Sequence, residues 1–512
     1  MKKILLIGAV LFIYQIHAQT FEWVKAPEID FNNNPDLIGY VTTVDSDSNI
    51  YLSGFADNRY IYTDIFGDLF FKKYNDQGQL LWEKTFTGKG QIFKITTDSQ
   101  KNTIVAAAFI DQLNIEATTL TSNEQGVEAV LLKFSPDGTL LWHEIIELGE
   151  FNNVNFKAVV VDAQDNIYLG YDNFWNSNIQ KRSPDGQSLL TITQNNVSLI
   201  SSVSIDNQGN IYAAGSCAES NATFNGVSAP TSLTYNTYIS KYDTLGSFQW
   251  VKYVEDITCP TPQVVAYSPD AVYFCSELNG DFSFDDIQIE GPQTSFMSDF
   301  FLAKLNAAGQ FQWVKEIIGS GRAYLGNRNF LNLDAQGNIY WVGSFSESIS
   351  WNSQFQSQSN GFRDALILKY NPEGEVVLAK SVGGDSYDRF DSVAVDQSGN
   401  IYLSGIGSNN FTFDAIPFSG SSLYNPFLAK LNPTSLNLAK PESMNSLIYP
   451  NPAHDVFFLN STGVKQLSIY NLLGQKIKEA NNPMSGIDIS DLSFGTYLVK
   501  TDMGVTFKLI KN

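Results

Sequence analysis

The chain has 512 residues, of which 43% are hydrophobic, 13% aromatic and 17% charged. This composition excludes an intrinsically disordered chain and favours strands, and the length exceeds what a single hydrophobic core usually serves. The formal net charge of −21 predicts no nucleic-acid partner, because an acidic body and a phosphate backbone repel each other.

The first residues have the form of a secretory signal peptide. Lys2 and Lys3 precede a near-continuous apolar run over 4–16, and Ala18 places a small residue before a polar start. The run is shorter than the roughly 20 apolar residues that cross a bilayer, and no later segment is apolar enough to do so. We therefore predict a signal peptide over 1–18, an exported chain and no transmembrane segment.

A short phrase with an acidic turn and an Asn-Ile-Tyr sequence returns along most of the chain. It reads "VDSDSNIYLSG" at 44–54, "VDAQDNIYLG" at 161–170, "IDNQGNIYAAG" at 205–215, "LDAQGNIYWVG" at 333–343 and "VDQSGNIYLSG" at 395–405. Two degenerate copies, at 97–107 and 267–276, bring the number to seven, with a mean spacing of about 58 residues. Repeats at such a spacing predict a solenoid or a propeller.

Each repeat contains the signals of four antiparallel strands. A strand such as "DSVAV" (391–395) leads through an Asx-Gly-Asn turn into "IYLSG", and a variable stretch then precedes a third strand such as "DALILKYN" (364–371). A second turn, such as "PEG" at 372–374, leads to a fourth strand that carries a Trp-x-Lys phrase in most repeats. Because no segment has a helical period, the pattern predicts an all-β propeller over 19–435.

The phrase "FEWVK" at 21–25 supplies a strand that the last repeat lacks. The seventh repeat has its first three strands, but "PTSLNLAKPES" follows the third without a Trp-x-Lys phrase. Closing a propeller with one blade built from both chain ends removes free strand edges. We therefore predict a seven-bladed β-propeller closed by the N-terminal strand, with Trp23 in the position that Trp82, Trp142, Trp250 and Trp313 occupy elsewhere.

The repeat pattern resembles the SBBP family, a seven-bladed propeller repeat of exported bacterial proteins. The matching phrases are "GNIYLSG", "DFFLAKLN" (299–306) and the Trp-x-Lys strand, and the resemblance extends over about 21–433. The third repeat departs from it, since "IQKRSPDGQSLLTITQ" (179–194) has neither the Phe-Leu-x-Lys strand nor the Trp. A shorter or irregular third blade is expected.

The chain changes character after a predicted linker over 436–446. Alternating strand signals and Gly-centred turns predict a small β-sandwich over 447–512. Its sequence resembles the type A C-terminal sorting domain of the type IX secretion system of Bacteroidota. The alternative interpretation is an accessory sandwich without a sorting role. The positions that carry the resemblance include Tyr449, Pro450, Asn451, Pro452, Gly474, Gly495, Tyr497 and Lys511. The resemblance implies passage through the periplasm, the secretion machinery as a partner, and delivery to the surface or the medium.

Few residues suited to catalysis or cofactor binding stand out. His143 follows Trp142 in an outer strand and His454 lies in the tail, so neither is placed to act with a nucleophile. The stretch "DSDSN" (45–49) begins like a calcium-binding EF-hand loop, but Ile50 and Ala56 replace its Gly and Glu. The three cysteines, Cys217, Cys259 and Cys275, lack metal-site spacing and permit either one disulfide or buried thiols. We predict no metal, no cofactor and no identifiable catalytic residue.

A ligand would bind on the face that carries the long, variable connections, which join strands two to three and four to one. The candidate residues there are Arg322, Tyr324, Arg328, Asp385, Asp388 and Arg389, and the alternative is that they are solvated loop residues. The favoured function is an exported module that binds a glycan or a protein. A carboxylate-based polysaccharide hydrolase or lyase and a structural or adhesion spacer are the alternatives. An exposed aromatic platform favours glycan binding, clustered carboxylates favour an enzyme, and a bare polar face favours a spacer.

Overall fold

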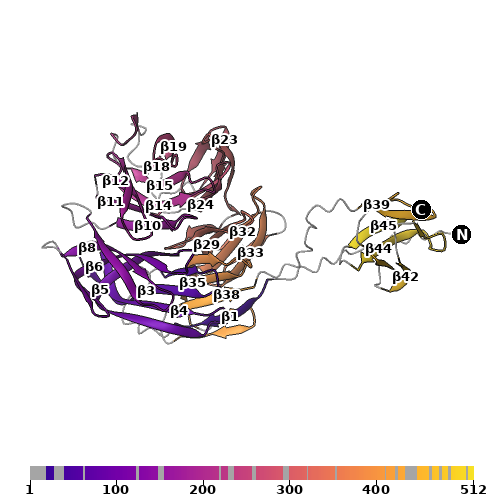
Figure 1. The fold of residues 1–512 in the computed structure, drawn as a ribbon, viewed down its shortest axis with the longest axis horizontal. Helices are drawn as coiled ribbons and strands as arrows, with labels where there is room; N and C mark the ends of the chain where they lie inside the picture. Colours follow the sequence, from indigo (N-terminus) through magenta and orange to yellow (C-terminus); the bar gives the residue numbers. More distant parts are fainter. Residues whose placement is uncertain are drawn as a thin grey trace. The chain divides into compact units, whose positions relative to one another are not determined.

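The computed structural model describes most of the chain after the predicted signal peptide. The described residues are 19–27, 40–61, 64–122, 126–147, 155–173, 175–217, 221–228, 236–255, 261–291, 299–319, 321–351, 355–409, 411–420, 425–432, 447–460, 464–471, 475–481, 486–502 and 506–512. They fall into two compact units, one within Gln19–Pro433 and one within Thr434–Asn512. Every regular element among them is a β-strand (Figure 1). The predicted signal peptide and linker, Cys259 and Gly474 lie outside the described residues.

The first unit is a series of antiparallel sheets. The largest contains β2 (Val41–Val44), β3 (Ile50–Ile61), β4 (Asp64–Tyr74), β5 (Leu80–Thr97), β6 (Thr103–Ile115), β8 (Val127–Phe134) and β9 (Leu140–Ile146), with β7 (Thr118–Thr121) beside β6. The long strand β5 belongs to two repeats, because its first part pairs with β4 and its second part pairs with β6.

The next three sheets have four strands each. They contain β10 (Asn155–Val161), β11 (Ile167–Asp172), β12 (Ser177–Arg182) and β13 (Ser188–Gln194); then β14 (Leu199–Ile205), β15 (Ile211–Cys217), β18 (Asn236–Tyr242) and β19 (Phe248–Glu255); then β20 (Gln263–Ser268), β21 (Ala271–Leu278), β24 (Asp299–Leu305) and β25 (Phe311–Lys315). The third repeat, from which an irregular blade was expected, therefore has four paired strands.

Two further sheets complete the unit. One contains β27 (Arg322–Leu325), β28 (Leu331–Leu333), β29 (Ile339–Ser346), β32 (Asp364–Tyr370) and β33 (Val376–Val382), and the other contains β34 (Arg389–Val395), β35 (Ile401–Gly407), β38 (Asn425–Leu431) and β1 (Phe21–Lys25). Small sheets occupy the connections between second and third strands: β16 (Thr223–Phe224) with β17 (Val227–Ser228), β22 (Asp281–Phe284) with β23 (Ile287–Glu290), β30 (Ser348–Ser350) with β31 (Gln356–Gln358), and β36 (Phe411–Phe413) with β37 (Ile416–Phe418). The short strand β26 (Ile318–Gly319), from the connection between β25 and β27, pairs with β30. First strands from successive sheets line one cavity, which is the arrangement of a β-propeller.

The repeated acidic turn is a hydrogen-bonding unit. The carboxylate of Asp45 accepts bonds from the backbone N–H groups of Asp47 and Asn49, both at 2.9 Å, and from the hydroxyl of Tyr51 at 3.2 Å. Lys73 of the third strand lies 3.5 Å from the same carboxylate and above the Tyr51 ring. Equivalent Asp–Asn–Tyr sets occur at Asp162, Asp206, Asp334 and Asp396. Asp45 is the first residue of the stretch that resembles an EF-hand loop, and its carboxylate is thus used by hydrogen bonds within its own hairpin.

Tryptophans of the outermost strands join neighbouring sheets. The indole of Trp250 packs on Gly309, in the turn between the third and fourth strands of the next sheet, and its Nε1–H donates to Ala307 O at 3.0 Å. A Cβ on Gly309 would lie 2.7 Å from the indole, and this glycine has a φ of +76°. The same contact joins Trp82 with Gly138, Trp142 with Gly186 and Trp313 with Gly374. In the third repeat Leu190 takes the place of Trp against Gly246.

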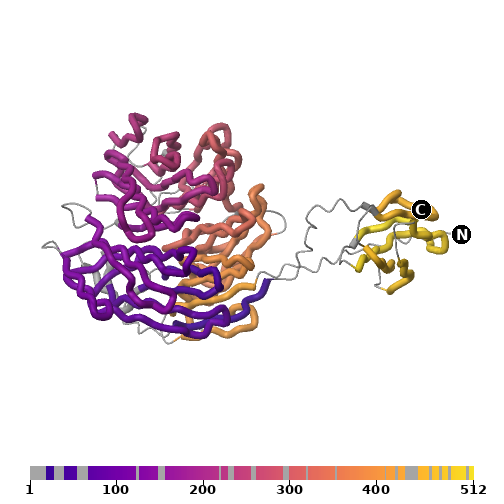
Figure 2. Tube along the Cα trace, in the orientation of Figure 1, coloured from indigo at the N-terminus to yellow at the C-terminus, as the bar shows by residue number. Residues whose placement is uncertain are grey.

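The N-terminal strand joins the last sheet in the expected position. β1 pairs antiparallel with β38, with Trp23 opposite Lys430, and the indigo and orange segments run side by side in Figure 2. Trp23 then repeats the contact of the other tryptophans, because its indole packs on Gly78 and donates to Asp76 O at 2.9 Å. Both of those residues belong to the turn between β4 and β5.

Ion pairs tie the outermost strands to the hairpins of the following repeat. Lys252, from a Trp-x-Lys phrase, lies 2.8 Å from Asp285 at the tip of β22–β23, and Asp285 also accepts the N–H of Phe311 at 3.0 Å. Lys380 and Asp414 form the same pair at 2.6 Å in the last sheet. There Asp414 accepts the N–H of Phe21 in β1 at 2.8 Å.

The second unit consists of two small sheets. One contains β39 (Leu447–Tyr449), β40 (Val456–Asn460) and β43 (Ile487–Asp488), and the other contains β42 (Lys476–Asn481), β41 (Gln466–Tyr470), β44 (Gly495–Thr501) and β45 (Thr506–Lys511). Phe457 and Leu459 of the first sheet share a buried cluster with Ile469, Val499 and Leu509 of the second. Two sheets that enclose a common core form a β-sandwich.

We predict that Gly78→Ala destabilises the first unit more than Gly226→Ala. Both glycines have positive φ, +72° and +85°, so each alanine adds a backbone penalty of roughly 1–2 kcal/mol. Only at Gly78 would the new Cβ meet an indole, 3.0 Å from Trp23, whereas nothing lies within 4 Å at Gly226. Urea unfolding should place Gly78→Ala at least about 1 kcal/mol below the control. Equal losses would show that the contact between Trp23 and the β4–β5 turn contributes nothing.

Candidate ligand-binding site

The six residues predicted from the sequence lie in two adjoining sheets. Arg322 and Tyr324 are in β27, and Arg328 lies in the turn before β28. Asp385 and Asp388 precede β34, and Arg389 begins it. The structure separates them into an exposed group around Tyr324 and Asp385 and an inner group around Arg328 and Arg389.

The exposed group is built around Arg363, which the sequence analysis did not single out. The Cζ atom of Arg363 lies 3.5 Å from the ring centroid of Tyr324 and 5.3 Å from that of Tyr387. Phe362 stacks on Tyr387 with the ring centroids 5.7 Å apart and the planes at 10°, and Phe362 is 71% exposed. A cation between aromatic faces is a favourable arrangement. We call Phe362, Arg363, Tyr324 and Tyr387 the aromatic platform.

Backbone bonds hold the aromatic platform together. Arg363 and Tyr387 form a parallel bridge, with the N–H of Arg363 donating to Ser386 O at 3.2 Å and the N–H of Asp388 donating to Arg363 O at 2.9 Å. The loop before β34 is therefore fixed to the start of β32. Because the platform combines residues from β27, the start of β32 and the loop before β34, no continuous stretch of sequence signals it. The one local signal is "GFRD" (361–364), an aromatic residue and an arginine directly before a third strand.

Two buried carboxyl groups lie under the platform and shape its loops. Asp388 is 1% exposed and accepts bonds from the N–H groups of Gly384 at 2.7 Å and Ser408 at 2.5 Å. Burial raises the pKa of Asp388. Burial also raises the pKa of Asp364 to about 6, and the charge of Asp388 adds to the rise. Asp388 thus positions the loop, whereas Asp385 is exposed beside the platform.

The inner group surrounds a fully buried carboxylate. The Nε–H of Arg389 donates to Asp391 at 2.5 Å, and Asp391 is 0% exposed. The backbone N–H groups of Tyr40 and Asn327 approach the same carboxylate at 3.4 Å. Burial lowers the pKa of Arg328 to about 10, and the charge of Arg389 lowers it further while Asp391 opposes the shift. This group connects β34 with the residue before β2 and with the turn before β28.

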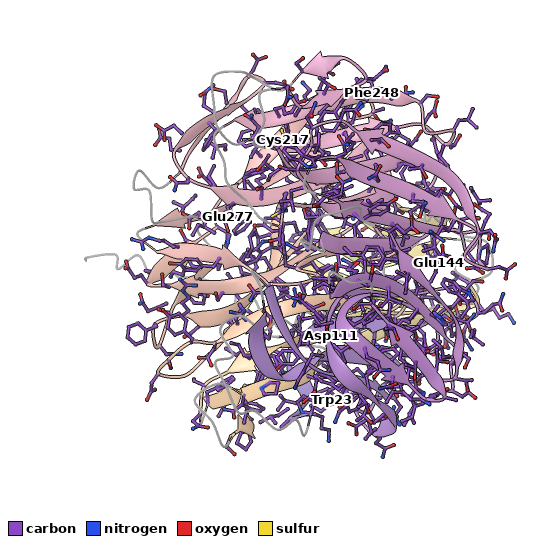
Figure 3. The ribbon with its side chains drawn as sticks, turned by 90° about the vertical axis from the view of Figure 1, so that its left-hand side faces the viewer. Trp23, Asp111, Glu144, Cys217, Phe248 and Glu277 are labelled. Carbon is purple, nitrogen blue, oxygen red and sulfur yellow. The ribbon has the colours of Figure 1, made fainter. Side chains whose placement is uncertain are left out.

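Three further carboxyl groups have a raised pKa, and Arg322 lies near one of them, Asp299. Burial raises the pKa of Glu277, labelled in Figure 3, to about 7. Burial likewise raises the pKa of Asp299 to about 6, even though the N–H of Ala323 donates to it at 2.7 Å and the charge of Arg322 favours its ionised form. The pKa of Glu316 rises to about 7 because of burial and the nearby charge of Asp299. Carboxyl groups that stay protonated near neutral pH are suited to general-acid chemistry.

The other candidate groups for chemistry lie apart from this face. His143 is an exposed residue of β9, and the side chain of His454 is 77% exposed in the second unit. Cys217 and Cys275 are both buried, and Cys217 is a free thiol. In the part of the chain that the structure describes, no group of three or more His, Cys, Asp or Glu residues is arranged to hold a metal ion.

Several of the predicted sorting positions bond to or pair with the terminal strand β45. Asn451 accepts the N–H of Ile510 at 2.9 Å and donates from Nδ2 to Lys508 O at 2.7 Å. Tyr449 stacks on Phe458, and Gly495 pairs with Lys511 across β44 and β45. The Tyr-Pro-Asn-Pro segment is thus docked on the terminal strand by the side chain of Asn451.

Comparison with known proteins identifies the second unit. Residues 447–512 match the model of the secretion system C-terminal sorting domain. A sorting domain of this kind indicates export, attachment at the cell surface and interaction with the type IX secretion machinery. No helix among the described residues has the length and apolar character needed to cross a membrane.

The chain also has remote similarity to other proteins. The chain is 21% identical over 481 residues to an uncharacterized WD repeat-containing protein of Acanthamoeba polyphaga mimivirus, covering 85% of this chain and 33% of that protein. It thus spans about one third of that relative's length. Among solved structures it is similar to a protein of unknown function from Bacteroides caccae, with 10% identity, a TM-score of 0.32 and coverage of 67% of this chain and 94% of that one.

Two further solved structures have similarly low scores. One is virginiamycin B lyase from Staphylococcus aureus, with 10% identity, a TM-score of 0.40 and coverage of 80% of this chain and 99% of that one. The other is PorZ, a surface component of the type IX secretion system of Porphyromonas gingivalis, with 8% identity, a TM-score of 0.27 and coverage of 94% and 76%.

We predict that Glu277→Gln removes part of the pH dependence of stability. The unfolded chain ionises Glu at a pKa of about 4.3, whereas folded Glu277 keeps its proton up to about pH 7. The wild-type protein therefore loses stability as pH rises between these values, and the glutamine variant does not. Urea unfolding should show Glu277→Gln gaining on the order of 1–3 kcal/mol over wild type between pH 4.5 and pH 8. The control Glu147→Gln, at an exposed position, should follow the wild-type slope, and parallel slopes for all three proteins would contradict the prediction.

Proposed function

We propose that residues 19–435 form a closed, seven-bladed β-propeller of the SBBP repeat type, followed by a linker over 436–446. Dividing the large sheet within β5 yields two four-stranded units, and the five remaining sheets contribute one each. Contacts between the first and last units support closure. The N–H of Thr42 donates to Ser392 Oγ at 3.1 Å, the hydroxyl of Ser404 donates to Tyr40 O at 3.0 Å, and Trp23 reaches the β4–β5 turn.

We further propose a delivery route for this propeller. A signal peptide over 1–18 carries the chain to the periplasm of a bacterium of the Bacteroidota, and the sorting domain then directs it through the type IX secretion system to the cell surface. The apolar run over 4–16 and the match over 447–512 support this route.

The delivered propeller functions as a binding module for a glycan. The observation that carries this proposal is the aromatic platform, where Phe362 is 71% exposed and stacks on Tyr387 with the ring planes nearly parallel. Flat aromatic faces accept the apolar face of a sugar ring, and neighbouring charged groups such as Arg363 and exposed Asp385 supply hydrogen bonds to its hydroxyls. Arg363 is already held between two rings, so little side-chain entropy is lost when a ligand binds.

A carboxylate-based hydrolase or lyase is the second candidate. The group around Asp299 and Glu316 favours it, because their raised pKa values keep protons available near neutral pH. Release of reducing ends from a polysaccharide, abolished by Glu316→Gln, would favour this function over binding alone. A protein that neither binds nor cleaves any glycan would favour the spacer.

We predict that Phe362→Ala and Tyr387→Ala each weaken glycan binding about tenfold or more, which corresponds to about 1.4 kcal/mol. A glycan array identifies the ligand with wild-type protein, and isothermal titration calorimetry then compares the variants. The control is Trp175→Ala, which removes a 50% exposed aromatic side chain elsewhere and should leave affinity unchanged. Wild-type affinity in both platform variants would refute the proposed site.

We predict that a chain lacking residues 447–512 accumulates in the periplasm. The deletion removes the whole second unit, including the terminal strand on which Asn451 docks. Cell fractionation and antibody labelling of intact cells measure the location. Phe362→Ala serves as the control, since a change in the platform should not affect export. Normal surface labelling of the truncated chain would refute the sorting role.

A further inference from the structure

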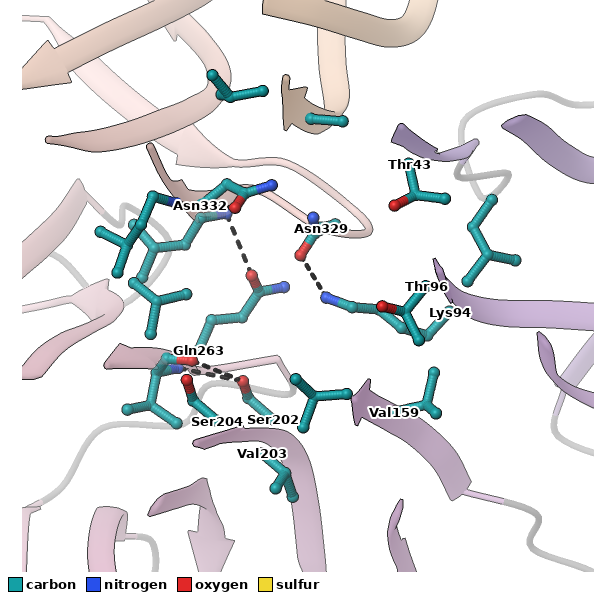
Figure 4. Close-up of a pocket in the computed structure, with 18 of the residues that line it drawn as sticks. Thr43, Lys94, Thr96, Val159, Ser202, Val203, Ser204, Gln263, Asn329 and Asn332 are labelled. Carbon is teal, nitrogen blue, oxygen red and sulfur yellow. Dashed lines mark hydrogen bonds between the residues drawn. The ribbon is translucent and has the colours of Figure 1, made fainter. Parts of the chain in front are cut away.

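The central cavity of the first unit holds a lysine among neutral polar groups (Figure 4). The cavity has a volume of about 340 Å³ and is lined by residues from β2, β5, β10, β14, β20, β28 and β34. Its polar side chains are hydroxyls and amides from Thr43, Thr96, Ser202, Ser204, Gln263, Asn329 and Asn332. Lys94 is the one charged residue among the described residues that line it, and no carboxylate is among them.

The amides around Lys94 are fixed by bonds to the backbone. The Nδ2 groups of Asn329 and Asn332 donate to Val393 O at 3.1 and 3.0 Å. The side chain of Gln263 accepts the N–H of Leu331 at 3.2 Å. Because Nδ2 of Asn329 is committed to the backbone, its Oδ1 atom faces the cavity and accepts a hydrogen bond from Lys94 Nζ. The wall of the cavity is therefore preorganised around the ammonium group.

One amide oxygen does not balance a positive charge. An ammonium group has three N–H donors, and Asn329 accepts one of them. Placing a charge in the interior without an opposite charge is costly, and burial accordingly lowers the pKa of Lys94 to about 8. Arg328 adjoins Asn329 in the chain. The buried pair of Arg389 and Asp391 lies close to the same turn, because the N–H of Asn327 approaches the Asp391 carboxylate at 3.4 Å. The surroundings of Lys94 thus favour an anion.

We propose that the central cavity binds a small oxyanion, a carboxylate or a phosphate group, through Lys94 and the hydroxyl of Thr96. The volume corresponds to roughly ten water molecules at about 30 Å³ each, which leaves room for the anion and for ordered water. The shared chemistry is a planar or tetrahedral group of oxygens that accepts hydrogen bonds from an ammonium and from hydroxyls. The site is independent of the aromatic platform and does not rest on glycan binding.

The test titrates the purified protein with inorganic phosphate, acetate and glucuronate at pH 7 and constant ionic strength, with calorimetry as the readout. We expect saturable binding of at least one anion and at least tenfold weaker binding by Lys94→Gln. The control Lys101→Gln removes a surface lysine that pairs with Asp47 and should bind as wild type. Binding of phosphate alone assigns a phosphate ligand, and binding of acetate or glucuronate assigns a carboxylate.

A second variant, Asn329→Asp, keeps the proposal testable if Lys94→Gln does not fold. Asn329→Asp keeps the shape of the side chain and places a carboxylate beside Lys94, so it should abolish anion binding while the thermal unfolding midpoint stays within a few degrees of wild type. Absence of saturable binding by the wild-type protein would overturn the proposal. So would wild-type affinity in either Lys94→Gln or Asn329→Asp.

Discussion

The contact between an outermost-strand tryptophan and a glycine of the next sheet is the constraint on which the first unit depends. Each indole covers a turn whose glycine has a positive φ, and the indole N–H of Trp250 donates to a carbonyl of the turn that it covers. A side chain of almost any other kind at Gly309 would collide with the ring. Among the described residues this contact occurs five times, and in the third repeat Leu190 takes the place of the tryptophan. Neighbouring sheets are therefore positioned in large part by the same local contact.

The polar residues of the repeat also hold its strands and sheets in place, through hydrogen bonds. The acidic residue of the turn accepts hydrogen bonds from the turn's own N–H groups and from the hydroxyl of a tyrosine in the strand that follows, as at Asp206 and Tyr212. Lysines such as Lys304 then donate to a carbonyl of the next sheet, at Pro372 O. The acidic residues of the turns, which resemble ligands for a cation, are therefore structural. The proposed ligand site instead uses residues that do not recur in the repeat, such as Phe362 and Arg363.

The repeat pattern allowed much of the fold to be predicted from the sequence. It gave little indication of which residues form the candidate ligand-binding site. The placement of residues 21–25 beside β38 followed from counting strands, because a missing Trp-x-Lys phrase at one end matched an isolated one at the other. Tyr324 was predicted, but its partners Arg363 and Tyr387 were not, since they come from different strands and meet only in three dimensions. Lys94 was not predicted, because the sequence around a single charged residue in a strand does not indicate whether its side chain faces a cavity or solvent.

The antiparallel pairing of β1 with β38 has a consequence for how the protein is made. Its partners, Val24 and Ala429, lie about 400 residues apart, so this sheet stays incomplete until nearly the entire polypeptide has emerged from the ribosome. Such high contact order slows folding and leaves an unpaired edge exposed in the meantime. The strand that completes the last sheet is therefore the first one synthesised, and it stays unpaired until its partner β38 has been made.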